Sequence, residues 1–231
     1  MTAAPFGRSQ RLYDAVYSWK DYAAEAERLQ PHLRGTSILD VACGTGGHIP
    51  HLRGAYEVVG VDIDPGMLDI AREKNPGAEF HAGDMRYFEL SRTFGTVMCL
   101  FSSIGYLPTV SDLDRALACF ARHVEPGGAV LIEPWIKAGE FEPRLPQSVI
   151  GESDGLRVAR MTLLELEGDS TVLTMHYLVG SEGRIDHLQE VHRLRLFSDE
   201  EYRGAFERAG LAVELDADGP MGRGLYIGAR R

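Results

Sequence analysis

Residues 38–47, with the sequence ILDVACGTGG, place an apolar run directly before a turn that contains three glycines. The apolar residues on both sides of Asp40 are typical of a strand that is buried on both faces. Gly44, Gly46 and Gly47 remove side chains from the turn, so a ligand can approach backbone N–H groups there. A tight turn that needs positive φ would use the same glycines, so the turn alone is a weak indication of a ligand site.

Further apolar runs alternate with helical patterns along the first two-thirds of the chain. Strands are predicted at residues 37–41, 57–61, 78–82, 96–101 and 129–133, and helices at residues 65–74 and 111–123. Ser111 is the predicted N-cap of the second helix, and Pro126 with Gly127 prevents its continuation. This alternation predicts an α/β fold, with a doubly wound and mostly parallel sheet.

The pattern changes after Glu133, where longer strands and short turns begin. Strands are predicted at residues 157–166, 172–179 and 187–197. The turns between them are so short that neighbouring strands must be antiparallel. We therefore expect an antiparallel flap inserted after the fifth strand. Ser198 then opens a capping box and a helix, which two closing strands at residues 211–215 and 225–229 follow.

The overall charge limits the classes of partner. The chain has 231 residues and a formal net charge of −10. This charge argues against nucleic acid or an anionic membrane surface as the main partner. An anionic substrate would therefore have to be held by a few specific arginines.

The cysteines and the N-terminus bear on the cellular compartment. Cys43, Cys99 and Cys119 cannot all pair, and no spacing among them resembles a metal site, so we expect reduced thiols and no metal. The first ten residues contain no apolar signal core, and no run approaches membrane-spanning length. We expect a soluble, cytoplasmic protein.

Two aspartates at predicted strand ends strengthen the case for a ligand. Asp62 ends the second strand about twenty positions after Gly44, where an acid can accept hydrogen bonds from both hydroxyls of a ribose. Asp84 follows the third strand, and Met67 lies where it could cover a flat ring. Each aspartate alone also suits a cap or a turn. Together with the glycines, they favour a nucleoside that carries an amino-acid tail.

The alternatives from other classes are less well supported. The dinucleotide pattern G-x-G-x-x-G fails because Ile49 stands where its last glycine belongs, which disfavours a nicotinamide-dependent oxidoreductase. A non-catalytic sensor with a degenerate site is also disfavoured, because the glycines and both aspartates are all present.

Several motifs carry a family resemblance. The stretches DVACGTG, VDID, GDMRYF, FSSIGYL and EPGGAVLIEPW, between Ser37 and Pro134, resemble class I S-adenosylmethionine-dependent methyltransferases. LYDAVYSWKDYAAEA, EVHRLRLF and GPMGRGLYIG resemble, more narrowly, bacterial N,N-dimethyltransferases of nucleotide-linked amino sugars, which make the dimethylamino sugars of macrolide-type antibiotics. The resemblance implies a Rossmann-like fold, S-adenosyl-L-methionine as cofactor, and a dTDP-type amino-deoxysugar as acceptor.

The resemblance also implies a set of cofactor-binding residues. These are Tyr22, Asp40, Ala42, Gly44, Gly46, Asp62, Met67, Asp84, Met85 and Leu100. The glycine turn would meet the methionine portion, with Asp40 near its ammonium group or supporting the turn from below. Asp62 would bind the ribose hydroxyls, and Asp84 with Met85 would meet the adenine edge. Leu100 or its neighbour would offer a backbone carbonyl to the ammonium group.

The expected acceptor side draws on the N-terminus, the flap and the last loop. Substrate-binding residues are predicted to be Tyr13, Tyr17, Tyr106, Trp135, Arg160 and Arg223. Methyl transfer is a one-step displacement that needs alignment and the exclusion of water more than a strong base. Tyr13, His192 and Glu133 are nevertheless the candidate catalytic residues, although His192 could simply pack in its strand and Glu133 could cap the loop at Trp135.

Arg223 stands between two glycines and is predicted to be exposed. An exposed guanidinium has an unobstructed fork that suits a diphosphate, although an arginine on a solvated turn would look the same. Ile136, where this family usually has an aromatic residue, and the apolar flap sequence leave another small natural-product amine or hydroxyl open as the acceptor.

Four segments follow from these boundaries. They are an N-terminal helical segment over the active site (1–36), a cofactor-binding core (37–150), an antiparallel flap on the acceptor side (151–197) and a return to the core (198–231). The oligomeric state stays open, with a homodimer among the expected assemblies.

Overall fold

The strand of the opening motif lies inside a seven-stranded sheet. The computed structural model describes residues 10–153 and 155–231, so the first nine residues of the predicted N-terminal segment lie outside it. β1 (Ser37–Val41) pairs in parallel with β2 (Glu57–Asp62) and with β4 (Phe94–Cys99). The sheet order is β10-β11-β5-β4-β1-β2-β3.

The outer strands of the sheet complete the predicted topology. They are β3 (Glu79–Ala82), β5 (Val124–Ile132), β10 (Leu211–Asp216) and β11 (Leu225–Arg230). β1 to β5 are parallel, whereas β11 runs antiparallel to both β5 and β10. The mostly parallel, doubly wound α/β sheet is therefore confirmed.

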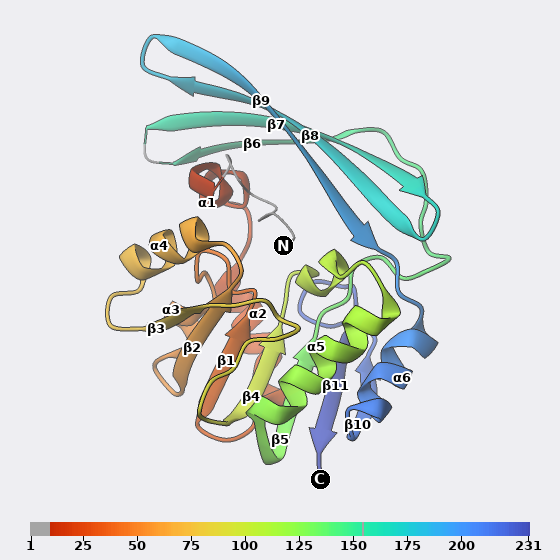
Figure 1. Cartoon of the computed structure of the whole chain (residues 1–231). Helices are drawn as coiled ribbons and strands as arrows, with labels where there is room; N and C mark the ends of the chain where they lie inside the picture. Colours follow the sequence, from red (N-terminus) through yellow and green to blue (C-terminus); the bar gives the residue numbers. More distant parts are fainter. Residues whose placement is uncertain (1–9, 154) are drawn as a thin grey trace.

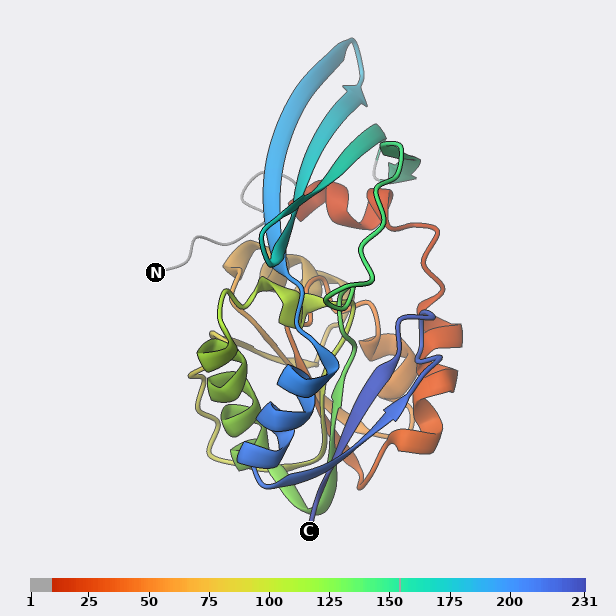
Figure 2. The same cartoon turned by 90° about the vertical axis from the view of Figure 1, so that its right-hand side faces the viewer.

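Helices cover both faces of this sheet (Figure 1, Figure 2). They are η1 (Gln10–Leu12), α1 (Tyr13–Val16), α2 (Tyr22–Leu29), η2 (Gln30–His32), α3 (Ile49–Leu52), α4 (Pro65–Lys74), η3 (Ser103–Tyr106), α5 (Val110–His123) and α6 (Asp199–Arg208). Successive residues of a strand point to opposite faces, so Leu39 packs in the cluster with α5 and α6, and Ile38 packs in the cluster with α2, α3 and α4. Burial on both faces explains the continuous apolar strands.

One predicted helix start is wrong. α5 begins at Val110, and its N-cap is Thr109, whose hydroxyl accepts the backbone N–H of Asp112. Thr109 has the extended backbone of an N-cap, whereas Ser111 already lies inside the helix. The capping box predicted at Ser198 is present.

A second sheet of four antiparallel strands forms the flap. It consists of β6 (Gln147–Ser153), β7 (Leu156–Glu167), β8 (Ser170–Ser181) and β9 (Arg184–Arg195). The predicted insertion after the fifth strand is confirmed, but β6 was not predicted, and β9 ends two residues before the predicted end at Phe197. β6 is an edge strand of mostly exposed residues, so it lacks the alternation that marks a half-buried strand.

The flap lies over the carboxyl ends of the parallel strands, with α1 packed against it (Figure 1). Leu12, Val16, Val158 and Tyr177 belong to one buried cluster between the two. Gly151 on β6 is required by this contact, because a Cβ there would lie 1.8 Å from the Ala15 carbonyl oxygen. Within the described ranges, no helix is long and apolar enough to cross a bilayer.

Candidate active site

Two adjoining cavities open between the strand ends and the flap. The main cavity, of about 280 Å³, is lined by the ends of β1 and β2, the turn after β3, η3 and Arg193 of β9. The small cavity, of about 30 Å³, lies between the glycine turn, the end of β4 and the start of α2. Both are lined by Tyr13, Ala42 and Ser103, so one extended ligand could occupy them together.

Each of the three positions in the opening motif requires glycine for a different structural reason. Gly44 lines the main cavity with φ of 55°, and no atom lies within 4 Å of the position a Cβ would take. A Cβ on Gly46 would meet the Asn75 side chain at 2.7 Å, and one on Gly47 would meet the Tyr22 ring at 2.5 Å. The left-handed backbone explains Gly44 at the cavity, the left-handed backbone (φ of 71°) and packing together explain Gly46, and packing against Tyr22 explains Gly47.

Asp62 ties the ends of β1 and β2 together. One carboxylate oxygen accepts the Gly44 N–H at 2.8 Å, and the other accepts the Asp64 N–H at 2.9 Å. Burial raises the pKa of Asp62, although these backbone hydrogen bonds oppose the rise. A carboxylate has about four lone-pair directions, so Asp62 keeps acceptor capacity on the cavity side.

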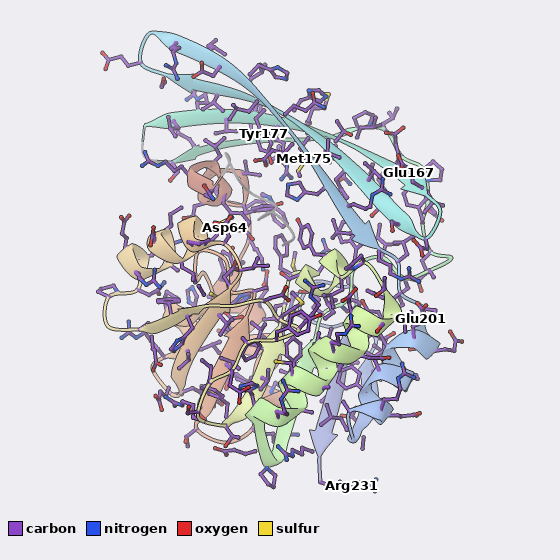
Figure 3. The ribbon with its side chains drawn as sticks, in the orientation of Figure 1. Asp64, Glu167, Met175, Tyr177, Glu201 and Arg231 are labelled. Carbon is purple, nitrogen blue, oxygen red and sulfur yellow. The ribbon has the colours of Figure 1, made fainter. Side chains whose placement is uncertain are left out.

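Asp64 is a cavity residue that sequence reasoning missed. Its carboxylate caps α4 by accepting the Gly66 N–H at 2.9 Å, and it also accepts from the Gln10 side chain at 2.9 Å. Figure 3 shows Asp64 at the start of α4, with Met175 and Tyr177 on the flap above. The Asp-Pro step before α4 is a recognisable helix start and could have identified Asp64.

Asp84 reaches the main cavity together with Arg86, which was also missed. The guanidinium donates to Asp84 Oδ1 at 2.9 Å and to Asp112 Oδ1 at 3.0 Å. The hydrogen bond from Arg86 holds the pKa of Asp84 below its ordinary value. Met67 and Met85 line the same cavity.

The small cavity gathers charged groups that come from separate elements. Asp40, Tyr22 and Leu100 line it, as predicted residues, beside Lys20, which was not predicted. Burial raises the pKa of Asp40 to about 7, and the Asp62 carboxylate contributes to the rise.

On the acceptor side, Tyr106 joins η3 to the flap. Its hydroxyl lies 2.5 Å from Nδ1 of His192, which is 2% exposed on β9. Tyr106 and Tyr13 both line the main cavity, whereas His192 lies behind Tyr106. Burial raises the pKa of both tyrosines, so both hydroxyls stay protonated at neutral pH.

Tyr17, Arg160 and Trp135 line neither cavity. Arg160 of β7 donates to the Tyr17 hydroxyl at 3.0 Å and lies over its ring. The Trp135 indole donates to the Thr171 hydroxyl at 2.8 Å, which ties the loop after β5 to the flap. These contacts join the core to the flap beside the cavities.

The prediction that Arg223 is exposed with an unobstructed fork is wrong. The side chain is half-buried, and its guanidinium lies over the rings of Trp135 and Phe101. Nη1 donates to the Ser102 hydroxyl at 2.8 Å. Arg223 lines neither cavity, because the residues after β4 stand in between.

Glu133 supports the same residues from behind. It is fully buried at the end of β5, and its Oε2 accepts the Phe101 N–H at 2.6 Å. Phe101 and Ser102 have φ of 52° and 63°, a left-handed conformation that non-glycine residues rarely adopt. Glu133 and Arg223 therefore hold a strained turn that forms one wall of the small cavity.

The comparisons with known proteins agree with this architecture. Residues 38–128 match the family model described as a methyltransferase domain. The dTDP-3-amino-3,6-dideoxy-alpha-D-glucopyranose N,N-dimethyltransferase of Streptomyces fradiae is 44% identical over 231 residues, which covers 96% of this chain and 91% of that protein.

Two solved structures are also similar over most of the chain. The crystal structure of Streptomyces venezuelae DesVI is 40% identical, covers 94% of this chain and 97% of its own, and superposes with a TM-score of 0.88. An amino pentose methyltransferase with bound S-adenosylmethionine, from Micromonospora echinaspora and involved in calicheamicin biosynthesis, is 34% identical, with a TM-score of 0.83 and coverage of 95% and 97%. Both matches include the flap and the segment before β1.

Proposed function

Because this chain belongs to the S-adenosylmethionine-dependent N,N-dimethyltransferases of nucleotide-linked amino sugars, we propose that it dimethylates the amino group of a dTDP-type amino-deoxysugar in antibiotic biosynthesis. One observation carries this proposal: the 44% identity covers 96% of the chain. The similarity therefore includes the N-terminal segment and the flap, which surround the acceptor side, as well as the core that all such methyltransferases share.

The cofactor is S-adenosyl-L-methionine, and the two cavities fit its two parts. We place the adenosine in the main cavity, with its ribose hydroxyls donating to Asp62 and its adenine beside Met67, Asp84 and Met85. The amino-acid tail then reaches the small cavity, past the open backbone at Gly44. When bound, this cofactor supplies a methyl group on a sulfonium sulfur that is already activated for displacement.

The residues of the chain have to align a neutral amine and exclude water. Tyr13 and Tyr106 line the main cavity from opposite sides of the cleft, α1 and η3, where they can hold the amine by hydrogen bonds. The amine nitrogen would gain a bond to the methyl carbon as the bond from that carbon to the sulfonium sulfur breaks, and the nitrogen would then have to lose a proton. The Tyr106 hydroxyl can take up that proton as it passes its own proton to Nδ1 of His192, 2.5 Å away. Glu133 lies behind Phe101 and acts as a positioning residue.

The nucleotide diphosphate needs a cation at the cavity. Arg193 of β9 lines the main cavity and forms an ion pair with Glu167 at 2.6 Å near the edge of the flap. Arg160 and Arg223, predicted for this task, line neither cavity. We propose that Arg193 contacts the diphosphate, because a guanidinium can bind two phosphate oxygens at once.

The apolar flap sequence gives no support to an apolar acceptor. Met161, Leu163 and Leu166 are exposed and line neither cavity. A small natural-product amine or hydroxyl therefore stays as the alternative only on account of Ile136.

We propose that the protein assembles as a homodimer through exposed apolar residues of the flap. Ile150, Met161, Leu178 and Val191 lie on the outer face of the flap, turned away from α1, and are 53–76% exposed. An apolar sheet face of this kind favours association, and two copies of one face are complementary by two-fold symmetry. Light scattering should give twice the chain mass for the wild type and the chain mass for Leu178→Arg.

Turnover against a panel of acceptors tests the proposed reaction. Nucleotide-linked 3-amino and 4-amino sugars should gain two methyl groups in the presence of S-adenosylmethionine, as read by mass spectrometry. The same amino sugars without the nucleotide are the matched control and should stay unmethylated at equal concentration. Equal methylation of the free sugars, or methylation of unrelated small amines alone, would reject the nucleotide-linked acceptor.

A further inference from the structure

Lys20 places a charged group in the interior, beside the small cavity. The residue is 7% exposed, and its side chain only 1%. It lines the small cavity together with Asp40 and Leu100. A buried ammonium group is costly unless it is paired and hydrogen-bonded, so its position here needs an explanation.

Two neighbours hold the ammonium group in place. Nζ of Lys20 forms an ion pair with the buried carboxylate of Glu25, and Nε2 of His48 lies 2.8 Å from the same oxygen. Burial alone would raise the pKa of Glu25, but the hydrogen bonds from His48 and Lys20 lower it. Burial lowers the pKa of His48, so the ring is neutral and donates to an ionised Glu25.

The ammonium group keeps donors that this pair does not use. A lysine has three N–H donors, and in residues 10–153 and 155–231 the described side-chain acceptor of Nζ is Glu25. Nζ also lies 4.4 Å from the Tyr22 ring centroid and 4.7 Å from that of Phe101. These two rings shield the ammonium group on two sides, and the cavity lies beside it.

The charges around the small cavity complement a zwitterion. Among the residues that line the small cavity, Asp40 and the residues after β4 offer acceptors, and Lys20 offers donors. The amino-acid tail of the cofactor carries an ammonium group and a carboxylate on the same carbon. Acceptors and donors that line one cavity suit those two groups.

We propose that Lys20 binds the α-carboxylate of the amino-acid tail, and that Glu25 and His48 are positioning residues that hold Lys20 towards the cavity. The inference rests on the cofactor and not on the proposed acceptor. A solely structural ion pair would serve equally well at any buried place, and apolar replacements are often neutral there. Because Lys20 lines the cavity, its remaining N–H groups can donate to a bound ligand, which a solely structural ion pair would not require.

Calorimetry with two ligands separates these roles. S-adenosylhomocysteine carries the amino-acid tail, whereas 5′-methylthioadenosine has the same nucleoside and sulfur without it. Lys20→Met should raise the Kd of S-adenosylhomocysteine about tenfold to a hundredfold, the effect of a lost hydrogen bond to a charged group. The Kd of methylthioadenosine should stay within about twofold. Lys137→Met, in the loop after β5, is the matched control and should change neither.

Removing Lys20 alone leaves the buried Glu25 carboxylate without its cationic partner, so a second variant has to show that the protein still folds. Lys20→Met/Glu25→Gln removes both charges of the pair, and thermal unfolding should show a folded protein. This double variant should still lose the preference for the ligand with the tail. An equal loss of affinity for both ligands, or an unchanged preference, would overturn the proposal. Neither measurement involves the acceptor, so failure of the amino-sugar proposal would leave it standing.

Discussion

On the core side of the cleft, Asp62 accepts hydrogen bonds from backbone N–H groups of two strand ends, whereas the flap side is held by contacts between side chains. Tyr106 meets His192, Arg160 meets Tyr17, and the Trp135 indole meets Thr171. The partners of Asp62 are backbone groups, whose positions are set by the pairing of β1 and β2. Side-chain contacts between core and flap can change from one sequence to another without loss of the fold.

The two sides should therefore respond differently to substitution. Variants on the core side should lose cofactor affinity and, where backbone groups lose their partner, stability. Variants on the flap side should lose acceptor turnover while cofactor affinity stays unchanged. Calorimetry with S-adenosylhomocysteine and steady-state kinetics with the acceptor measure the two effects separately.

The largest effect is expected at Asp62. Asp62→Ala removes the acceptor of the Gly44 and Asp64 N–H groups. The Asp64 N–H is then buried without this partner, which costs about 1–3 kcal/mol, whereas Gly44 is only half-buried at the main cavity. Affinity for S-adenosylhomocysteine should fall at least about a hundredfold, because the proposed contact with the ribose is lost as well. Asp69→Ala, on the exposed face of α4, is the control. If Asp62→Ala bound the cofactor as tightly as the control does, the cofactor site would not depend on the core side of the cleft.

The next effect is a pH dependence that comes from Asp40. Burial raises its pKa to about 7, so the free protein holds a proton on Asp40 below that pH. We expect Asp40 to bind the ammonium group of the tail in its ionised form, so the proton must leave on binding. Affinity for S-adenosylhomocysteine should fall about tenfold for each pH unit below about 7 and level off above it. The dependence should disappear in Asp40→Asn. A flat profile in the wild type would place the ammonium group elsewhere.

The same raised pKa affects stability with a defined sign. Asp40 binds its proton more tightly in the folded state than in the unfolded state, where its pKa has the ordinary value of 3.8. Its contribution therefore lowers the free energy of unfolding as pH rises from about 4 to about 7. In thermal unfolding without cofactor, Asp40→Asn should lose this part of the pH dependence.

A smaller effect, on acceptor turnover and not on cofactor affinity, is expected at Tyr106 on the flap side of the cleft. Tyr106→Phe removes the hydroxyl that meets His192 but keeps the ring on the main cavity. Turnover of the acceptor, as kcat/KM, should fall about tenfold, which corresponds to about 1.4 kcal/mol. Affinity for S-adenosylhomocysteine should not change. Tyr56→Phe, whose hydroxyl meets Gln30 away from the cleft, is the matched control. A joint loss of cofactor affinity would mean that the two sides are not separate.

The smallest effect is expected at Arg223. Whether it falls on cofactor affinity or on acceptor KM tells which side of the cleft Arg223 serves. Arg223→Met removes the hydrogen bond to Ser102 and loosens the strained turn at the small cavity. Affinity for S-adenosylhomocysteine should fall about threefold to tenfold, the effect of one hydrogen bond of about 1 kcal/mol. The acceptor KM at saturating cofactor should not change. Arg208→Met, which pairs with Asp114 on α5, is the control. A raised acceptor KM with normal cofactor affinity would restore the diphosphate role.

Local patterns were sufficient for the sheet and for the core side of the cleft. Apolar runs buried on both faces mark parallel strands, and the carboxyl ends of such strands meet at one edge. The positions of Gly44 and Asp62 therefore followed from the chain order. The edge strand β6 was not predicted, because its residues are mostly exposed and show no alternation of apolar and polar residues.

Only the tertiary structure could decide the partners of the charged side chains. Lys20 and Glu25 lie five residues apart, whereas His48 follows the glycine turn, and nothing in their spacing indicates that Lys20 and His48 meet at one buried oxygen of Glu25. Arg223 looked exposed because its neighbours are glycines, yet Trp135 and Phe101, distant in sequence, cover it. Hydrophobic periodicity reports which face of an element is buried. It does not report which long side chains from different elements meet there, because that depends on how the elements pack.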